Sequence, residues 1–224
     1  MSPTITHYKF PLSPNSFKVD IALKEKGLEY EDHVVNLVTG DQHTKEFHAI
    51  NNREQIPALT YGDAKVSESS AILQFIDTAF PNEVSLTSKD PVNLGQCLKY
   101  VAELDTRFST KNVAFQVVFL KQGKEDLGDK VEEFKKEIAV WEGYLENKKF
   151  LAGDSVSLAD ISLFPMIGQA HLWLGLDLAK YPNIEKWYKA FEQRPSVKGH
   201  KFFDLAGNLD EMLGLDATKR RVLA

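Results

Sequence analysis

The stretch PLSPNSFKV, residues 11–19, places small polar side chains directly before an amphipathic segment. Ser13, Asn15 and Ser16 are residue types that begin helices, where a side-chain oxygen accepts a hydrogen bond from a backbone N–H group. A helix start also presents free N–H groups and the positive end of the helix dipole, which together bind anions. The stretch is therefore consistent both with an ordinary helix cap and with an anion site.

Two further stretches combine polar side chains with a local structural signal. In NREQIPAL, Pro57 is typical of the start of a strand and Gln55 fits a solvated loop. In SESSAILQFI, Glu68 and Ser69 fit a helix start with a serine cap and an acidic first turn. From the residues alone, local structure explains both stretches without a chemical role.

The composition is that of a globular protein and excludes several other classes. Of the 224 residues, 43% are hydrophobic and 26% are charged, and the net charge of −5 argues against nucleic-acid or anionic-membrane partners. No apolar run approaches the ~20 residues of a membrane span, and no signal peptide is visible. The single cysteine, Cys97, excludes an intrachain disulfide. No metal-ligand spacing or glycine-rich phosphate loop occurs, so we expect no metal and a cytoplasmic location.

The elements that must position these residues fall into two parts. Up to residue 80, strand and helix signals alternate and predict a mixed sheet. The expected elements are strands at 4–10 and 29–37, helices at 15–27, 44–50 and 70–80, and a hairpin at 57–69 that turns at Gly62-Asp63.

A polar stretch with a proline at each end, residues 81–91, predicts a linker, and the chain beyond it has helical periodicity. The clearest helical stretches are 94–108, 131–146, 157–176 and 181–195. Ser157 and Asp160 have the spacing of a capping box, which we assign to folding rather than to chemistry.

Four stretches, in this order and at this spacing, resemble the cytosolic glutathione transferases over nearly the whole chain. They are SPNSFKVDIALKEKG, NREQIPAL, SESSAILQFI and FLAGDSVSLADISLFP. The resemblance implies an α/β, thioredoxin-like glutathione-binding domain (1–81) followed by an all-α domain (91–224) that contributes a hydrophobic electrophile site. The stretch AELDTRFSTKNVAFQVVFLKQG is similar to phi-type and fungal phi-like members. SPNSFKV is also similar to nu-type and nitrogen-regulator-like members, so the class stays open.

The resemblance implies a catalytic role for Ser13 or Asn15. Ser13 falls where serine-type members place the hydroxyl that contacts the sulfur of glutathione. A serine is too weak an acid to act as a base, but its hydroxyl can donate a hydrogen bond that stabilises the thiolate. Asn15 is the alternative sulfur contact, since an amide donates equally well, or it caps the first helix.

The same resemblance implies where the rest of glutathione binds. A cis bond between Ile56 and Pro57 is expected to turn the Ile56 backbone toward the cysteinyl part, where it pairs like an added strand. Gln55 is expected to contact the glycine carboxylate, and His43 to assist at that end. Asn52 and Glu54 depart from the proline and glycine that the family often has there, and Glu54 adds negative charge.

At the other end, the resemblance implies that the helix start and the Ser69 hydroxyl receive the γ-glutamyl carboxylate while Glu68 pairs with the α-ammonium. Phe10, Phe108 and Phe115 are candidates for the hydrophobic electrophile site, although aromatic residues on a helical stripe are also typical of a core.

These features predict a glutathione transferase that conjugates the thiolate to small hydrophobic electrophiles, with peroxidase activity as an additional reaction. The alternatives are a glutathione-dependent disulfide reductase of nu-like type and a non-catalytic binding or regulatory protein of the same fold. Glutathione is then a co-substrate, with no further cofactor. We expect a homodimer without nucleic-acid or membrane partners.

Overall fold

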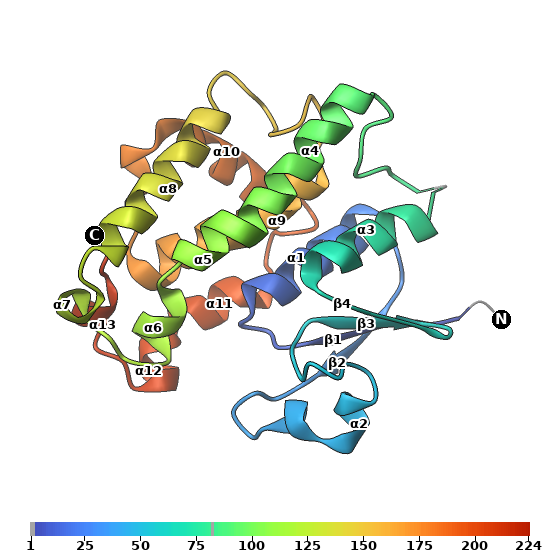
Figure 1. Cartoon of the computed structure of the whole chain (residues 1–224), viewed down its shortest axis with the longest axis horizontal. Helices are drawn as coiled ribbons and strands as arrows, with labels where there is room; N and C mark the ends of the chain where they lie inside the picture. Colours follow the sequence, from blue (N-terminus) through green and yellow to red (C-terminus); the bar gives the residue numbers. More distant parts are fainter. Residues whose placement is uncertain (1–2, 82) are drawn as a thin grey trace. The chain divides into compact units, whose positions relative to one another are not determined.

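The computed structural model describes residues 3–81 and 83–224 (Figure 1). By its internal contacts the chain divides into two compact units, Met1–Thr87 and Ser88–Ala224. Within the described residues, no helix combines the length and the apolar character that crossing a bilayer requires.

The first unit is built on a four-stranded sheet in the order β2-β1-β3-β4. The strands are β1 (Ile5–Lys9), β2 (Glu31–Val34), β3 (Ala58–Tyr61) and β4 (Ala64–Ser67). The pair β1–β2 is parallel, whereas β1–β3 and β3–β4 are antiparallel. The hairpin turns at Gly62, whose φ of 58° lies in the left-handed region that glycine adopts without strain. The mixed sheet predicted from the sequence is confirmed.

Helices cover both faces of this sheet. Figure 1 shows α1 (Pro14–Glu25) and α3 (Ser69–Ala79) packed together on one face and α2 (Lys45–His48), which follows a 3₁₀ turn at Asp41–His43, on the other. The middle of α1 is buried and supplies apolar side chains to the core beside those of α3. The buried apolar residues of the two helices include Phe17, Val19, Ile21, Leu23, Ile72, Leu73 and Ile76.

The segment after α3 is fixed to the first unit by one buried carboxylate. Asp77 Oδ1 accepts from Lys26 Nζ at 3.0 Å and from the Leu86 N–H at 2.8 Å. Lys26 Nζ also donates to the Val84 carbonyl at 2.8 Å. Lys26 is 1% exposed, so this pair replaces the water that both charges lose on folding.

The second unit is helical. It contains α4 (Pro91–Glu103), a π-helical turn (Leu104–Phe108), α5 (Ser109–Lys111), α6 (Ala114–Val118), α7 (Lys124–Leu127), α8 (Lys130–Tyr144), α9 (Leu158–Leu174), a 3₁₀ turn (Leu178–Lys180), α10 (Pro182–Glu192), α11 (Lys201–Gly207), α12 (Leu209–Leu213) and α13 (Ala217–Arg220).

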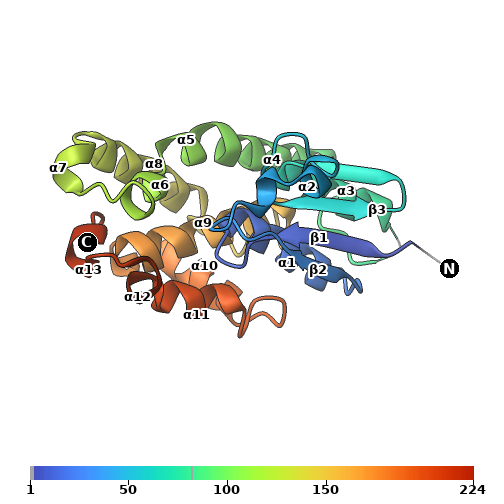
Figure 2. The same cartoon turned by 90° about the horizontal axis from the view of Figure 1, so that it is seen from below.

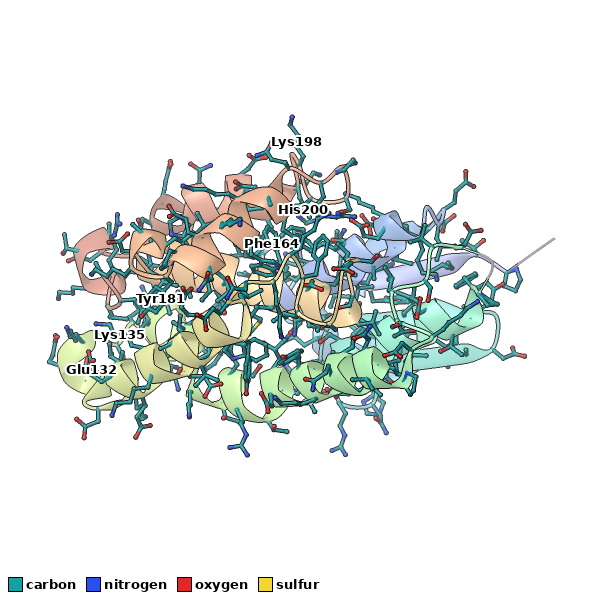
Figure 3. All side chains as sticks on the ribbon, turned by 90° about the horizontal axis from the view of Figure 1, so that it is seen from above. Glu132, Lys135, Phe164, Tyr181, Lys198 and His200 are labelled. Atoms are coloured by element: carbon teal, nitrogen blue, oxygen red, sulfur yellow. The ribbon has the colours of Figure 1, made fainter. Side chains whose placement is uncertain are left out.

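The helix α9 runs through the middle of this unit and is buried almost throughout (Figure 2). Phe164, labelled in Figure 3, lies in the middle of α9. Its ring stacks on those of Tyr188 and Phe191 of α10, with centroids 4.6 and 4.8 Å away. The capping box predicted at Ser157 and Asp160 is present at the start of α9. The sequence therefore predicted both the core helix and its N-cap residue, Ser157.

Candidate functional site

A cavity of about 380 Å³ lies in the first unit, and three separate segments form most of its wall. These are the start of α1, the loop before β3 and the start of α3. The residues that line the cavity are Asn15, Leu37, Gln42, Asn51, Glu54, Gln55, Ile56, Pro57, Glu68 and Ser69. Most of the polar residues selected from the sequence therefore lie in one wall, although they are up to 54 positions apart, from Asn15 to Ser69.

Ser13 caps the helix α1. Its Oγ accepts from the Ser16 N–H at 3.2 Å, and Pro14 occupies the first helical position, where the missing N–H costs nothing. This bond uses a lone pair of the hydroxyl oxygen, so the hydroxyl hydrogen stays available for another acceptor. Capping the helix and donating to a ligand are thus compatible for Ser13, although Ser13 is not among the residues that line the cavity.

Asn15 lies one residue inside α1, is exposed, and lines the cavity. Its amide makes no hydrogen bond to any of the described residues. The alternative role of Asn15 as helix cap therefore does not hold, because Ser13 is the cap. Ser16 is buried, and its Oγ accepts from the Phe10 N–H at 3.4 Å, which ties the turn to the end of β1.

Asn51 holds the loop that precedes β3. Its Nδ2 donates to the Gln55 carbonyl at 2.7 Å, and its Oδ1 accepts from the Arg53 N–H at 3.0 Å. The Ile56–Pro57 bond at the end of this loop is cis. Asn51 is 5% exposed and was not singled out from the sequence. The signal that could have found it is an Asx-type turn residue shortly before a proline.

Glu54 occupies an unusual backbone position in this loop. Its φ of 56° lies in the left-handed region, which explains why a glycine is often found there, and costs a non-glycine residue about 1–2 kcal/mol. The carboxylate accepts from His43 Nδ1 at 2.7 Å and from His48 Nδ1 at 3.1 Å. These bonds, that of His43 foremost, hold the pKa of Glu54 below its ordinary value. His43 is thus engaged with Glu54 and is not itself a lining residue.

The start of α3 forms the opposite part of the cavity wall. Glu68 precedes the helix with a φ of 67° and makes no side-chain cap bond, and Ser69 is the first helical residue. The serine cap that the sequence suggested here is absent from α3. Because no side chain satisfies the first N–H groups of this helix, they can receive an anion.

The three candidate aromatic residues have different surroundings. Phe10 is half-buried in the first unit, at the end of β1. Phe108 is 0% exposed in the core of the second unit, with its ring 5.1 Å from that of Phe134. Phe115 of α6 is 62% exposed, and its ring lies 5.5 Å from that of Phe119. Of these three residues, Phe115 is the most exposed.

A charged cluster of the buried His7 and Asp20 and the exposed Asp32 lies outside the cavity lining, on β1, α1 and β2. Within the described residues, His7, Asp20 and Asp32 are the group whose ligand atoms are close enough to hold a metal ion. Lys9 Nζ lies 2.8 Å from both Asp20 and Asp32, so an ammonium group already supplies the positive charge between these carboxylates. The cluster is an ion-pair network that reaches the surface at Asp32.

Comparison with known proteins agrees with this architecture. Residues 3–78 match "Glutathione S-transferase, N-terminal domain", and residues 96–195 match "Glutathione S-transferase, C-terminal domain". Glutathione S-transferase 3 of Zea mays is 32% identical over 201 residues, covering 85% of this chain and 90% of that protein. The chain therefore belongs to the glutathione S-transferase family.

Solved structures show the same fold. A glutathione S-transferase from the Antarctic clam Laternula elliptica aligns with a TM-score of 0.78 and 28% identity, covering 87% of this chain and 90% of that one. A glutathione transferase homologue from Drosophila mojavensis, solved with bound glutathione, aligns with a TM-score of 0.84 and 22% identity, covering 94% and 98%. The predicted combination of a thioredoxin-like domain and an all-helical domain is confirmed.

Proposed function

We propose that this protein activates the thiol of glutathione as the thiolate and conjugates it to small hydrophobic electrophiles. The observation that carries the proposal is the convergence of Asn15, the loop at Gln55–Pro57 and the start of α3 at Glu68 on one cavity. Membership of the glutathione S-transferase family supports it.

The cavity wall offers a partner for each end of glutathione. The uncapped start of α3 and the Ser69 hydroxyl receive the γ-glutamyl carboxylate, and the Glu68 carboxylate pairs with the α-ammonium. The Ile56 backbone pairs with the cysteinyl part, and Gln55 contacts the glycine end. This orientation directs the sulfur to the start of α1, where Ser13 and Asn15 lie.

The start of α1 is sufficient to stabilise a thiolate without a general base. Lowering a thiol pKa from about 8.5 by roughly two units requires about 2.7 kcal/mol. A hydrogen bond to a charged group supplies about 1.5–3 kcal/mol, and a helix N-terminus adds about 0.3–1 kcal/mol. Either Ser13 or Asn15 can supply the hydrogen bond.

Thiolate formation alone gives a modest rate gain. The shift raises the thiolate fraction near pH 7 from about 3% to about 75%, but the lower nucleophilicity removes about 8-fold, leaving about 3-fold. Most of the rate enhancement must therefore come from holding the electrophile. We propose that residues 91–224 contribute that site, with the exposed Phe115 as its first candidate, and that residues 1–81 bind glutathione.

Disulfide reduction with glutathione is the second candidate activity. The position of Asn15 favours disulfide reduction, because its amide is unpaired among the described residues and lines the cavity. Ser13 is not a lining residue. A reductase of this kind would use the same bound thiolate on a disulfide in place of an electrophilic carbon.

Three turnover assays distinguish the candidates after retention on immobilised glutathione. Turnover of an aryl halide supports conjugation, turnover of a hydroperoxide supports the peroxidase reaction, and turnover of a small disulfide supports the reductase. Retention without turnover of any of the three would contradict an enzymatic role and leave a binding protein. Light scattering would test the homodimer that we also propose, with a mass twice the 25.3 kDa of one chain.

A further inference from the structure

Gln42 connects the cavity wall to His43 and Glu54. Its Nε2 lies 3.0 Å from His43 Nε2, while His43 Nδ1 lies 2.7 Å from Glu54 Oε2. A carboxylate oxygen can only accept, so His43 donates its Nδ1–H to Glu54. The other ring nitrogen of a neutral His43 then carries a lone pair, which accepts from the Gln42 amide.

This arrangement leaves one polar atom unsatisfied. Gln42 Oε1 is buried and has no hydrogen-bond partner among the described residues, which is uncommon for a buried polar atom in a folded protein. A half-turn of the amide exchanges the two atoms, so that Oε1 faces His43 Nε2 and the NH₂ group takes the unpaired position. That second arrangement requires hydrogen on both ring nitrogens, and hence a protonated His43.

We propose that a carboxylate bound at Gln42 selects the second arrangement, so that binding of the glycine end of glutathione is coupled to protonation of His43. This inference rests on the proposed function. The proton comes from solvent and no covalent bond to carbon changes. In the bound state, hydrogen bonds run continuously from Glu54 through His43 and Gln42 to the ligand carboxylate.

Electrostatics favour the same coupling. With His43 neutral, a ligand carboxylate meets the charge of Glu54 and the oxygen of Gln42, and both repel it. With His43 protonated, the positive ring compensates Glu54, and Gln42 offers a donor. Gln42 therefore positions the ligand, and His43 acts through Gln42 rather than by direct contact.

The other charged groups around this network do not replace His43 in the role. His48 of α2 bonds to Glu54 Oε1, and among the described residues it makes no hydrogen bond to Gln42. Asp41 accepts from the Asn36 N–H at 3.2 Å and from Thr39 Oγ1 at 2.8 Å, within its own turn. Hydrogen bonds from the histidines hold the pKa of Glu54 below its ordinary value, so this carboxylate stays ionised near neutral pH.

Glu68, the other carboxylate of the cavity wall, belongs to the start of α3 and is assigned to the opposite end of glutathione. Carboxylates ordinarily titrate far below neutral pH, whereas histidine is the side chain that changes charge between about pH 5 and 8. A pH dependence of binding in this range is therefore assigned with variants of the two histidines that bond to Glu54.

Calorimetric titration with S-methylglutathione tests the coupling, because this ligand has no thiol that could release a proton. Binding is measured at about pH 6.5 and pH 7.5, each in two buffers of different ionisation enthalpy, which together give the number of protons taken up. We expect net proton uptake and about fivefold tighter binding at the lower pH, the effect of one histidine titrating in this range.

Two matched variants locate the titrating group. His43→Asn keeps an amide that can donate to Glu54 but removes the titrating ring, and should abolish both the proton uptake and the pH dependence. His48→Asn removes the other histidine on the same carboxylate and should retain both. A merely structural role of His43 would not produce this difference in proton uptake between the two variants.

Each remaining outcome has a defined meaning. Equal affinity at both pH values without proton uptake overturns the coupling but leaves the proposed function standing, and so does proton uptake that persists in His43→Asn. Absence of S-methylglutathione binding at both pH values overturns the proposed function, and the coupling with it.

Discussion

At the residue scale, the central feature is a pair of hydrogen-bond donors at the start of α1. Ser13 accepts from a backbone N–H with its oxygen and keeps its hydroxyl hydrogen, whereas the amide of Asn15 makes no hydrogen bond to the described residues. Sequence alone identified both residues but could not rank them, because the choice depends on side-chain direction rather than residue type. The cavity lining favours Asn15, and the resemblance favours Ser13.

We predict that removing the side chain that donates to the sulfur lowers the thiolate fraction of bound glutathione by about fourfold or more near neutral pH, since a hydrogen bond to a charged group is lost. Ser13→Ala and Asn15→Ala are compared by the ultraviolet absorbance of the thiolate during a pH titration. Affinity for S-methylglutathione should change little, because that ligand has no thiolate to stabilise.

Ser13→Thr is the control, since threonine retains both the helix cap and the hydroxyl hydrogen. If neither alanine variant shifts the thiolate titration, the start of α1 does not activate the sulfur.

Gln42 and Asn51 show the limit of sequence-based prediction at this scale. Gln42 carries no signal at its position, and the Asx-turn signal at Asn51 is weak, because amide side chains are common in loops. Their roles arise from neighbours that only the folded loop brings together, His43 for Gln42 and the Gln55 carbonyl for Asn51. By contrast, a helix start near Glu68 and Ser69 was predicted, since helix starts have local chemical signatures, although the residue before the helix is Glu68 and not the serine that was expected.

At the element scale, the loop before β3 depends on one buried side chain. We predict that Asn51→Ala lowers the free energy of unfolding by about 1–3 kcal/mol, because the Gln55 carbonyl and the Arg53 N–H lose their partner. Affinity for S-methylglutathione should fall as well, since Gln55 and Ile56 line the cavity. Urea unfolding and calorimetry measure the two effects.

The neighbouring Asn52→Ala is the matched control for stability, because Asn52 is exposed. An equal loss of stability in the two variants would show that the hydrogen bonds of Asn51 do not hold the loop.

The start of α9 is the corresponding element in the second unit. Asp160 accepts from the Leu151 N–H at 2.9 Å, the Ser157 N–H at 3.0 Å and Trp187 Nε1 at 3.1 Å, so a single carboxylate joins three segments. We predict that Asp160→Asn costs about 1–3 kcal/mol, since an amide cannot accept from all these donors.

Urea unfolding measures this cost against Asp129→Asn, in which the changed residue precedes α8 and makes no cap bond. A cost no larger than that of the control would contradict the role of Asp160. Sequence located this cap because its spacing is local, but Leu151 and Trp187 were not predictable, because they reach Asp160 only in the folded unit.

At the scale of the whole molecule, the chain end shows how distant segments close the second unit. Arg220 of α13 donates to Asp210 of α12, with its Nη2 2.7 Å from Oδ2, and also to the carbonyls of Leu172 and Trp173 at the end of α9. The Leu223 N–H donates to the Leu174 carbonyl at 2.9 Å. No sequence signal predicted these contacts, because α11 to α13 are short and their pairing is long-range.

The contribution of the Asp210–Arg220 ion pair to stability depends on pH. The hydrogen bond from Arg220 holds the pKa of Asp210 below its ordinary value, so the pair stabilises the fold above the unfolded-state pKa and its contribution is lost as pH falls through the folded-state pKa. We predict that Asp210→Asn costs no more than about 1 kcal/mol near pH 7, because the carboxylate is partly exposed, and that the cost begins to decline below about pH 4 and disappears once the pH is under the folded-state pKa. Thermal unfolding across this range measures the difference, and a cost that grows toward acid would contradict the assignment.

The architecture was largely predictable, whereas the site was predictable only in part. Periodicity gave the mixed sheet and the core helix α9, since both are determined by local hydrophobic patterns. The strand β2 ends before the predicted residue 37 because the Asn36 N–H donates to Asp41 Oδ2 in a turn, at 3.2 Å, and not to a neighbouring strand. The convergence of Asn15, Gln55 and Glu68 on one cavity followed from the family resemblance and not from any local pattern.

The most direct test of the account is a crystal structure with glutathione bound. The account predicts glutathione in the first-unit cavity, its γ-glutamyl carboxylate at the start of α3 and its sulfur within hydrogen-bonding distance of Ser13 Oγ or Asn15 Nδ2. Glutathione bound elsewhere, or in this cavity with its sulfur directed away from both side chains, would contradict it.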